Sequence, residues 1–321
     1  MIARRIVLTA IALAMWAGIA ASQPYTNRPV KILVPYSVGT GNDILARFIG
    51  QKLGEMWGTT FVVENRPGAS GNIGTAAVAQ AVPDGTTLLL TPNNFVVSPY
   101  VYKNAQYDPL KDFAPVALLG WGRLLLVAHP GTGFKSLGDM LAAVRARPGK
   151  LTYASPGAGT PHQVSMELFK VLAGVDILHV PYKSSGPAVI DLLGGEVNLM
   201  FLPIHVAQPY IKDGRLRVLG IGSARRAAVL PEVPTLAEQG LKGAEVDIWY
   251  AMYAPARTPA DIISKLNSGI NAVLSSPENK AALAKQGLET SPGSVMELAT
   301  LTTDDAARWK EIARRANLSV D

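Results

Sequence analysis

The spacing of apolar and polar positions changes along the chain, and these changes predict alternating strands and helices. Short apolar runs at Val30–Pro35, Phe61–Glu64 and Leu124–Ala128 indicate buried strands. Apolar residues that recur every three or four positions in Ile44–Met56 and Pro161–Leu172 indicate helices with one buried face. Further strands are predicted at residues 87–91, 151–155, 177–181, 197–201, 217–221 and 247–254, followed by C-terminal helices broken near Pro277 and Pro292.

This alternation predicts an α/β fold. Two β–α blocks, one beginning near Val30 and one near Leu151, favour two lobes, each a mainly parallel sheet flanked by helices. Ligands of open α/β sheets bind where strands end and helices begin. The turns that follow the strands are therefore the places to search for a site.

The N-terminus has the layout of a secretory signal peptide. Arg4 and Arg5 precede the apolar run Ile6–Ala21, and small residues follow at Ala20–Ser22. The pattern predicts a signal peptide at residues 1–22 and export to the periplasm. The alternative, an uncleaved anchor, is disfavoured because the run is short for a span of about 20 residues.

Composition excludes several kinds of site. The chain has no cysteine, so disulfides, thiolate zinc sites and a cysteine nucleophile are absent. No phosphate-binding loop, G-x-S-x-G or H-E-x-x-H motif occurs, and the net charge of +6 is spread without a basic, aromatic-rich run. We expect no metal, no cofactor, no nucleic-acid partner and no enzyme activity. The histidines are far apart in sequence and suit structural roles: His129, His162, His179 and His205.

Three glycine-rich turns carry the candidate chemistry: Pro35–Asp43, Asn65–Gly74 and Ser155–His162. Glycines let a ligand approach the backbone, and free N–H groups at a helix N-terminus bind carboxylates. The third turn is the most convincing, because Thr160 is a good N-cap and Pro161 a good first helical residue. The alternative for each is an ordinary β–α turn.

The candidate ligand-binding residues come from these turns and from the strand ends beside them. Asp191 is included although it reads more simply as a solvent-facing acid on an apolar helix. The predicted set is Tyr36, Ser37, Gly39, Thr40, Gly41, Asn42, Asp43, Ser70, Thr91, Asn93, Ser155, Gly157, Gly159, Thr160, His162 and Asp191.

Many short stretches, in order along nearly the whole mature chain, resemble one family. The matching stretches are Arg28–Ile32, Val34–Tyr36, Val63–Ala69, Pro83–Gly85, Tyr107–Pro109, Lys111–Phe113, Pro148–Leu151, Tyr153–Ser155, Val180–Lys183, Asp191–Gly195, Ile211–Gly214 and Val233–Thr235. On these stretches the chain is similar to the substrate-binding proteins of tripartite tricarboxylate transporters, also called the Bug family.

The resemblance implies a two-lobed venus-flytrap fold with two crossover strands. Lobe 1 would comprise residues 23–123 and 248–321, and lobe 2 residues 124–247. Family members bind small carboxylates through the loops that correspond to Tyr36–Asp43 and Ser155–Thr160. One departure is Val38-Gly39-Thr40, where the family usually has Pro-Gly-Gly.

The predicted function is therefore a periplasmic solute-binding protein, acting as a monomer. It would capture a small carboxylate (a di- or tricarboxylate, an aromatic acid or an acidic amino acid) for integral membrane subunits of a transporter. Two alternatives stay open at this stage. One is a secreted binding protein that serves a sensor kinase, and the other is a secreted hydrolase or isomerase.

Overall fold

The computed structural model describes residues 28–315 of the chain. The predicted signal peptide at residues 1–22 lies outside the described residues. None of the helices in the described range is long and apolar enough to cross a membrane.

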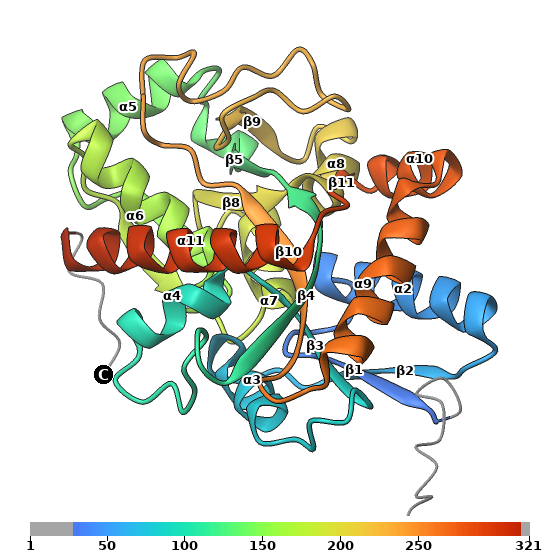
Figure 1. Ribbon diagram of the computed structural model, residues 1–321. Coiled ribbons are helices and arrows are strands. Elements are labelled where there is room, and N and C mark those ends of the chain that lie inside the picture. The colour runs from blue at the N-terminus through green and yellow to red at the C-terminus, as the bar shows by residue number, and fades with distance from the viewer. Residues whose placement is uncertain (1–27, 316–321) are drawn as a thin grey trace, which may run out of the picture.

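The first lobe is built on a six-stranded sheet with the order β11-β4-β10-β3-β1-β2 (Figure 1). Its strands are β1 (Val30–Val34), β2 (Phe61–Asn65), β3 (Thr87–Pro92), β4 (Phe113–Gly122), β10 (Ile248–Pro255) and β11 (Leu288–Thr290). Its helices are α2 (Gly41–Trp57), η2 (Ala69–Gly71), α3 (Asn72–Ala79), α4 (Asn94–Val101), α9 (Ala260–Ser275), α10 (Pro277–Lys285) and α11 (Val295–Arg315).

The second lobe is built on a five-stranded sheet with the order β7-β6-β8-β5-β9. Its strands are β5 (Leu124–Ala128), β6 (Thr152–Ser155), β7 (Leu178–Pro181), β8 (Leu199–Pro203) and β9 (Arg217–Ile221). Its helices are η3 (Pro130–Thr132), α5 (Leu137–Ala146), α6 (Pro161–Ala173), α7 (Ser185–Gly194) and α8 (Ile204–Lys212).

The predicted two-lobed α/β fold is confirmed, but the sheets are mixed rather than mainly parallel. In the first sheet β1 pairs in parallel with β2 and β3, whereas β10 and β11 pair antiparallel to their neighbours. In the second, β6 pairs in parallel with β7 and β8, and β5 runs antiparallel to β8 and β9. The cause is the connection between lobes: β4 and β5 carry the chain out and β10 brings it back, against the direction of the strands beside them.

Arg123 stands where the chain passes from β4 to β5. Its side chain is 5% exposed, and its guanidinium pairs with Asp247, just before β10, and with Glu289 on β11. It also donates to Ser223 Oγ at 2.9 Å. One buried cation thus ties both connections between the lobes together.

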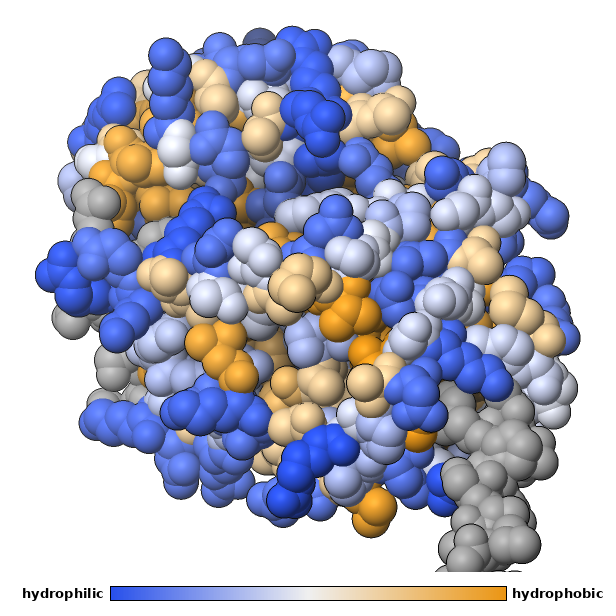
Figure 2. Space-filling model, viewed as in Figure 1, coloured by the Kyte–Doolittle hydropathy of each residue, from blue (hydrophilic) through white to orange (hydrophobic). Residues whose placement is uncertain are grey.

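The lobes pack against each other. Val164 on α6, in the second lobe, belongs to the same buried cluster as Trp249 and Trp309 of the first lobe. The indole of Trp249 is almost fully buried and donates to Asp305 Oδ2, so this residue is a core element. Figure 2 shows that the outer face in that view is mostly polar, with apolar residues in separated patches.

Candidate functional site

The second and third glycine-rich turns meet between the lobes. Tyr102, at the end of α4, donates from its hydroxyl to the Ala158 carbonyl across the interface at 2.9 Å. The same hydroxyl lies 2.8 Å from Ser70 Oγ. Gly157 is so near that a β-carbon on it would lie 2.8 Å from Ser70 Oγ. Only glycine leaves room for this approach, and its φ of +129° also requires glycine.

The first turn joins the same region through Tyr36 and Asn94. The Tyr36 hydroxyl donates to Asn94 Oδ1, and Asn94 Nδ2 donates to the Ser70 carbonyl at 2.9 Å. Burial raises the pKa of Tyr36, so its hydroxyl stays protonated. The three turns that the sequence singled out therefore converge around Ser70, between the lobes.

Helix α2 begins in the first turn without a side-chain cap. Thr40 occupies the N-cap position, but its hydroxyl donates backwards to the Ser37 carbonyl at 3.0 Å. The Gly39 N–H donates to Asp43 Oδ2 at 2.9 Å, which holds the turn in shape. The first N–H groups of α2 are thus left free of capping side chains.

Helix α6 repeats this arrangement in the other lobe. Thr160 is its N-cap, yet the Thr160 hydroxyl donates to the Gly157 carbonyl at 2.6 Å. The Gly159 N–H donates to Gln163 Oε1 at 2.7 Å, as Gly39 does to Asp43. The sequence correctly placed Thr160 and Pro161 at the helix start, but the Thr160 hydroxyl does not cap it.

These two helix starts suit an anion. Uncapped N–H groups together with the helix dipole attract negative charge. The start of α5 shows the contrast: Ser136 and Asp139 form a capping box, in which the Ser136 side chain accepts from the Asp139 N–H and the Asp139 side chain accepts from the Ser136 N–H.

Several buried polar atoms beside the helix starts have no partner among the described residues. They are Asn42 Oδ1 on α2, Asn93 Oδ1 before α4, His162 Nδ1 on α6 and His205 Nε2 on α8. Buried polar atoms are nearly always bonded, so four such atoms at the ends of interlobe helices favour a polar guest or ordered water. A narrow gap lined by both lobes, including Asn93 and Gly159, lies in this region, but it is too small in this structure to admit a water molecule.

The structure brings His162 and His205 close together, although they are far apart in sequence. Burial, with the neighbouring His205, lowers the pKa of His162 to about 3. Burial lowers the pKa of His205 to about 4. Both rings are neutral at ordinary pH and offer hydrogen bonds without charge. No cluster of three or more metal-ligating side chains occurs in residues 28–315.

Tyr250 is a candidate that sequence reasoning missed. It is 3% exposed on β10, and its hydroxyl has no hydrogen-bond partner among the described residues. A β-carbon on Gly41, the first residue of α2, would lie 2.6 Å from that hydroxyl. In the sequence Tyr250 sits in an apolar run and reads as a core residue, so no local pattern marks it.

Some predicted residues have local partners instead. Asp43 is buried, which alone would raise its pKa, but hydrogen bonds from Arg47 and Gly39 lower it below its usual value. Asp191 is half-buried and accepts a hydrogen bond of 2.6 Å from Tyr182. Thr91 is fully buried within β3. These groups stabilise the lobes.

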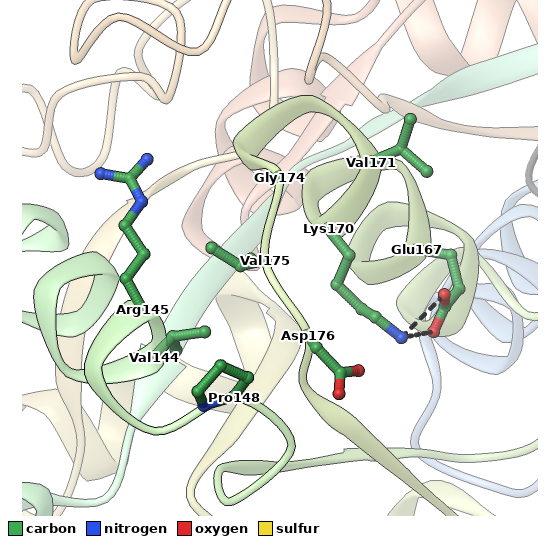
Figure 3. Close-up of a pocket in the computed structure, with 9 residues that line it drawn as sticks. All are labelled: Val144, Arg145, Pro148, Glu167, Lys170, Val171, Gly174, Val175 and Asp176. Carbon is green, nitrogen blue, oxygen red and sulfur yellow. Dashed lines mark hydrogen bonds and ion pairs between the residues drawn. The ribbon is translucent and has the colours of Figure 1, made fainter.

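A second hollow, of about 500 Å³, lies on lobe 2 between the end of α5 and the outer side of α6. Figure 3 shows Lys170 and Glu167 paired on its wall, with Arg145 extending from α5. None of the predicted site residues lines it.

Comparison with known proteins identifies the family. Residues 45–318 match the family model described as tripartite tricarboxylate transporter family receptor. The chain belongs to this family. Protein BugT of Bordetella pertussis is 36% identical to this chain over 303 residues, which cover 93% of each protein. The predicted resemblance is confirmed.

Two solved structures share the receptor fold. One, from R. palustris, is Rpa4515 with adipate: it has a TM-score of 0.89, 33% identity, and covers 92% of this chain and all of its own. The other, MatC from Rhodopseudomonas palustris with bound malate, has a TM-score of 0.83 and 31% identity, over 89% of this chain and 99% of its own.

Proposed function

We propose that this receptor captures a small carboxylate between its lobes in the periplasm and delivers it to the membrane subunits of the transporter. The observation that carries the proposal is the pair of uncapped helix starts, α2 in one lobe and α6 in the other, each with its N-cap threonine hydroxyl turned away. The bound adipate and malate of the two similar structures support a carboxylate guest.

The guest is held by dipoles rather than by a cation. Arg123, the buried cation between the lobes, is already paired with Asp247 and Glu289. Hydrogen bonds to a charged group are worth about 1.5–3 kcal/mol each, so two or three N–H or O–H donors suffice for tight capture. Donors from both lobes favour the closed state, which the transporter would recognise.

Calorimetry tests the carboxylate proposal. We expect adipate or malate to bind to the purified protein and the neutral diamide of adipate not to bind. Equal binding of acid and diamide would refute it. The dicarboxylate recovered after binding should be chemically unchanged, since we propose no catalysis.

A matched pair of variants tests the position of the site. Gly41→Ala places a β-carbon against the Tyr250 hydroxyl at the start of α2, whereas Gly138→Ala in the first turn of α5 meets only an ordinary contact of 3.6 Å with Ser136 Oγ. We expect Gly41→Ala to weaken binding and Gly138→Ala to leave it unchanged.

Three further points complete the proposal. We place the lobe borders at residues 123/124 and 247/248, as the sheet membership of the strands supports. Residues 1–22 are a cleaved signal peptide, which the mass of protein released from the periplasm would test. The protein acts as a monomer, which light scattering would test. Co-purification of membrane partners would distinguish a transporter from a sensor kinase as the partner.

A further inference from the structure

The Ser155 hydroxyl, in the third turn, has a single hydrogen but lies within hydrogen-bonding distance of several groups. It is fully buried, 2.7 Å from His179 Nε2 and 3.1 Å from the Gly157 carbonyl, and it accepts from the Gly157 N–H at 3.3 Å. The direction of its single hydrogen decides whether Ser155 presents a donor or only lone pairs to the turn.

His179 is fixed in place by its surroundings. It is paired in register with Tyr153 on the neighbouring strand, and the two rings stack at 4.6 Å with 14° between their planes. The Tyr153 hydroxyl donates to Glu167, which Lys170 also binds (Figure 3). The groups of α6 and β6 that face His179 are thus a balanced ion pair and a neutral phenol.

Burial lowers the pKa of His179, with Glu167 opposing that effect and Lys170 adding to it. The ring is therefore neutral at pH 7 and carries one proton, on either Nδ1 or Nε2. If Nε2 were unprotonated, the Ser155 hydroxyl would donate its hydrogen to Nε2, and only the oxygen lone pairs of Ser155 would face an anion. If Nε2 carries the proton, His179 and the Gly157 N–H both donate to Ser155, whose own hydrogen is then donated to the Gly157 carbonyl at 3.1 Å and can turn to a bound anion.

The Gly157 carbonyl does not need that hydrogen, because it already accepts from the Thr160 hydroxyl at 2.6 Å. We propose that His179 is a positioning residue: it carries its proton on Nε2, donates to Ser155, and thereby turns the Ser155 O–H towards the bound carboxylate. This inference rests on the proposed function. His179 then affects the affinity for the carboxylate without contacting it, because it acts through Ser155.

Nitrogen NMR on protein labelled in its histidines tests the first half without any ligand. We expect His179 in the Nε2–H form. The Nδ1–H form would overturn the proposal, even if the protein binds adipate well. This result also stands apart from the proposed function, since it is obtained whether or not any carboxylate binds.

Adipate supplies the second readout. A carboxylate held by Ser155 favours the charged ring, so adipate should raise the pKa of His179 followed by NMR. The NMR signals of His129, whose ring caps η3, should stay unchanged when adipate is added. An unmoved His179 in protein saturated with adipate would contradict the proposal.

Two variants separate the hydrogen bond from packing. His179→Phe keeps the stacked ring but has no nitrogen, and should weaken adipate binding by roughly five- to tenfold, the range of one lost hydrogen bond. His179→Gln lacks the ring but places an amide N–H near the Nε2 position, and should bind within about threefold of wild type. If His179→Phe binds like wild type, or the two variants lose affinity equally, the assignment is wrong.

Discussion

Replacing Gly157 by alanine tests whether the two lobes must come as close together as this structure places them. The added β-carbon would lie 2.8 Å from Ser70 Oγ in the other lobe. Ordinary contact needs about 3.5 Å, so the oxygen or the lobe has to retreat by roughly 0.7 Å. Because Ser70 is across the interface, the clash exists only when the lobes approach as closely as they do in this structure.

The expected magnitude follows from the cost of overpacking. Forcing a methyl group into a filled site costs about 1–3 kcal/mol. Since this cost falls on closure, the Kd for adipate should rise by roughly 5- to 150-fold. The positive φ of Gly157 adds backbone strain, but that strain is present in open and closed forms alike and lowers stability more than affinity.

The assay is a double-mutant cycle read by calorimetry. Ser70→Ala removes the oxygen that the new β-carbon would strike, so Gly157→Ala should cost much less affinity in that background. Gly174→Ala, at the end of α6, is the strain control: its φ is +62° and no atom lies within 4 Å of the added carbon. Wild-type affinity in Gly157→Ala, or no relief from Ser70→Ala, would refute the closed arrangement argued here.

Three further changes have expected outcomes. Tyr102→Phe removes the hydrogen bond to Ala158 across the interface and should weaken adipate binding by roughly two- to tenfold in calorimetry. Gln163→Glu keeps an acceptor for Gly159 but adds negative charge to the first turn of α6, so it should weaken adipate binding in calorimetry, and more strongly at low than at high ionic strength. The pKa values of His162 and His205 are lowered from 6.5. Both imidazole rings therefore stay neutral in the folded protein, whereas in the unfolded chain they take up protons below pH 6.5. Stability is therefore full above that pH and should fall by about 2 kcal/mol for each histidine between pH 7.5 and 5, measured by urea unfolding.

Local patterns predicted the elements whose residues act locally. The strand Leu124–Ala128 and the start of α6 at Thr160 and Pro161 are as expected, because an apolar run and a helix start depend only on neighbouring residues. Strand β11 was missed: three residues long, it exists because it pairs with β4. Nothing in so short a segment marks a partner that lies more than 160 residues earlier.

Helix α4 and strand β4 were also missed, and each contains a proline. Pro99 lies inside α4 and cannot donate to the Phe95 carbonyl, but the Tyr107 hydroxyl bonds that carbonyl at 3.0 Å and replaces the lost bond. In β4, Pro115 pairs with Tyr253 at a register shift, where the ladder is already irregular. In both cases a distant side chain or strand compensates for the proline, and the sequence around it gives no sign of this.

The candidate site divides in the same way. Its glycine-rich turns were visible because glycine, a small polar cap and a following helix are adjacent in sequence. Tyr250, Tyr102 and His179 were not, since each acts on a turn from a different element. The sequence singled out the turns that we propose hold the anion and missed the side chains that shape or close those turns.

The two helix starts hold their turns in the same way but differ in charge. This difference indicates where the anion is held more strongly. In α2 the third residue is Asp43, whose negative charge already lies at the positive end of the helix and is balanced by Arg47 at 2.9 Å. In α6 the same position is Gln163, which holds the turn equally well but is neutral. Because a helix dipole that already faces a carboxylate attracts a second one less, we expect the α6 start, with the Ser155 hydroxyl beside it, to be the stronger carboxylate site. The start of α2, with the Tyr250 hydroxyl beside it, is then better suited to the more weakly held end of the ligand.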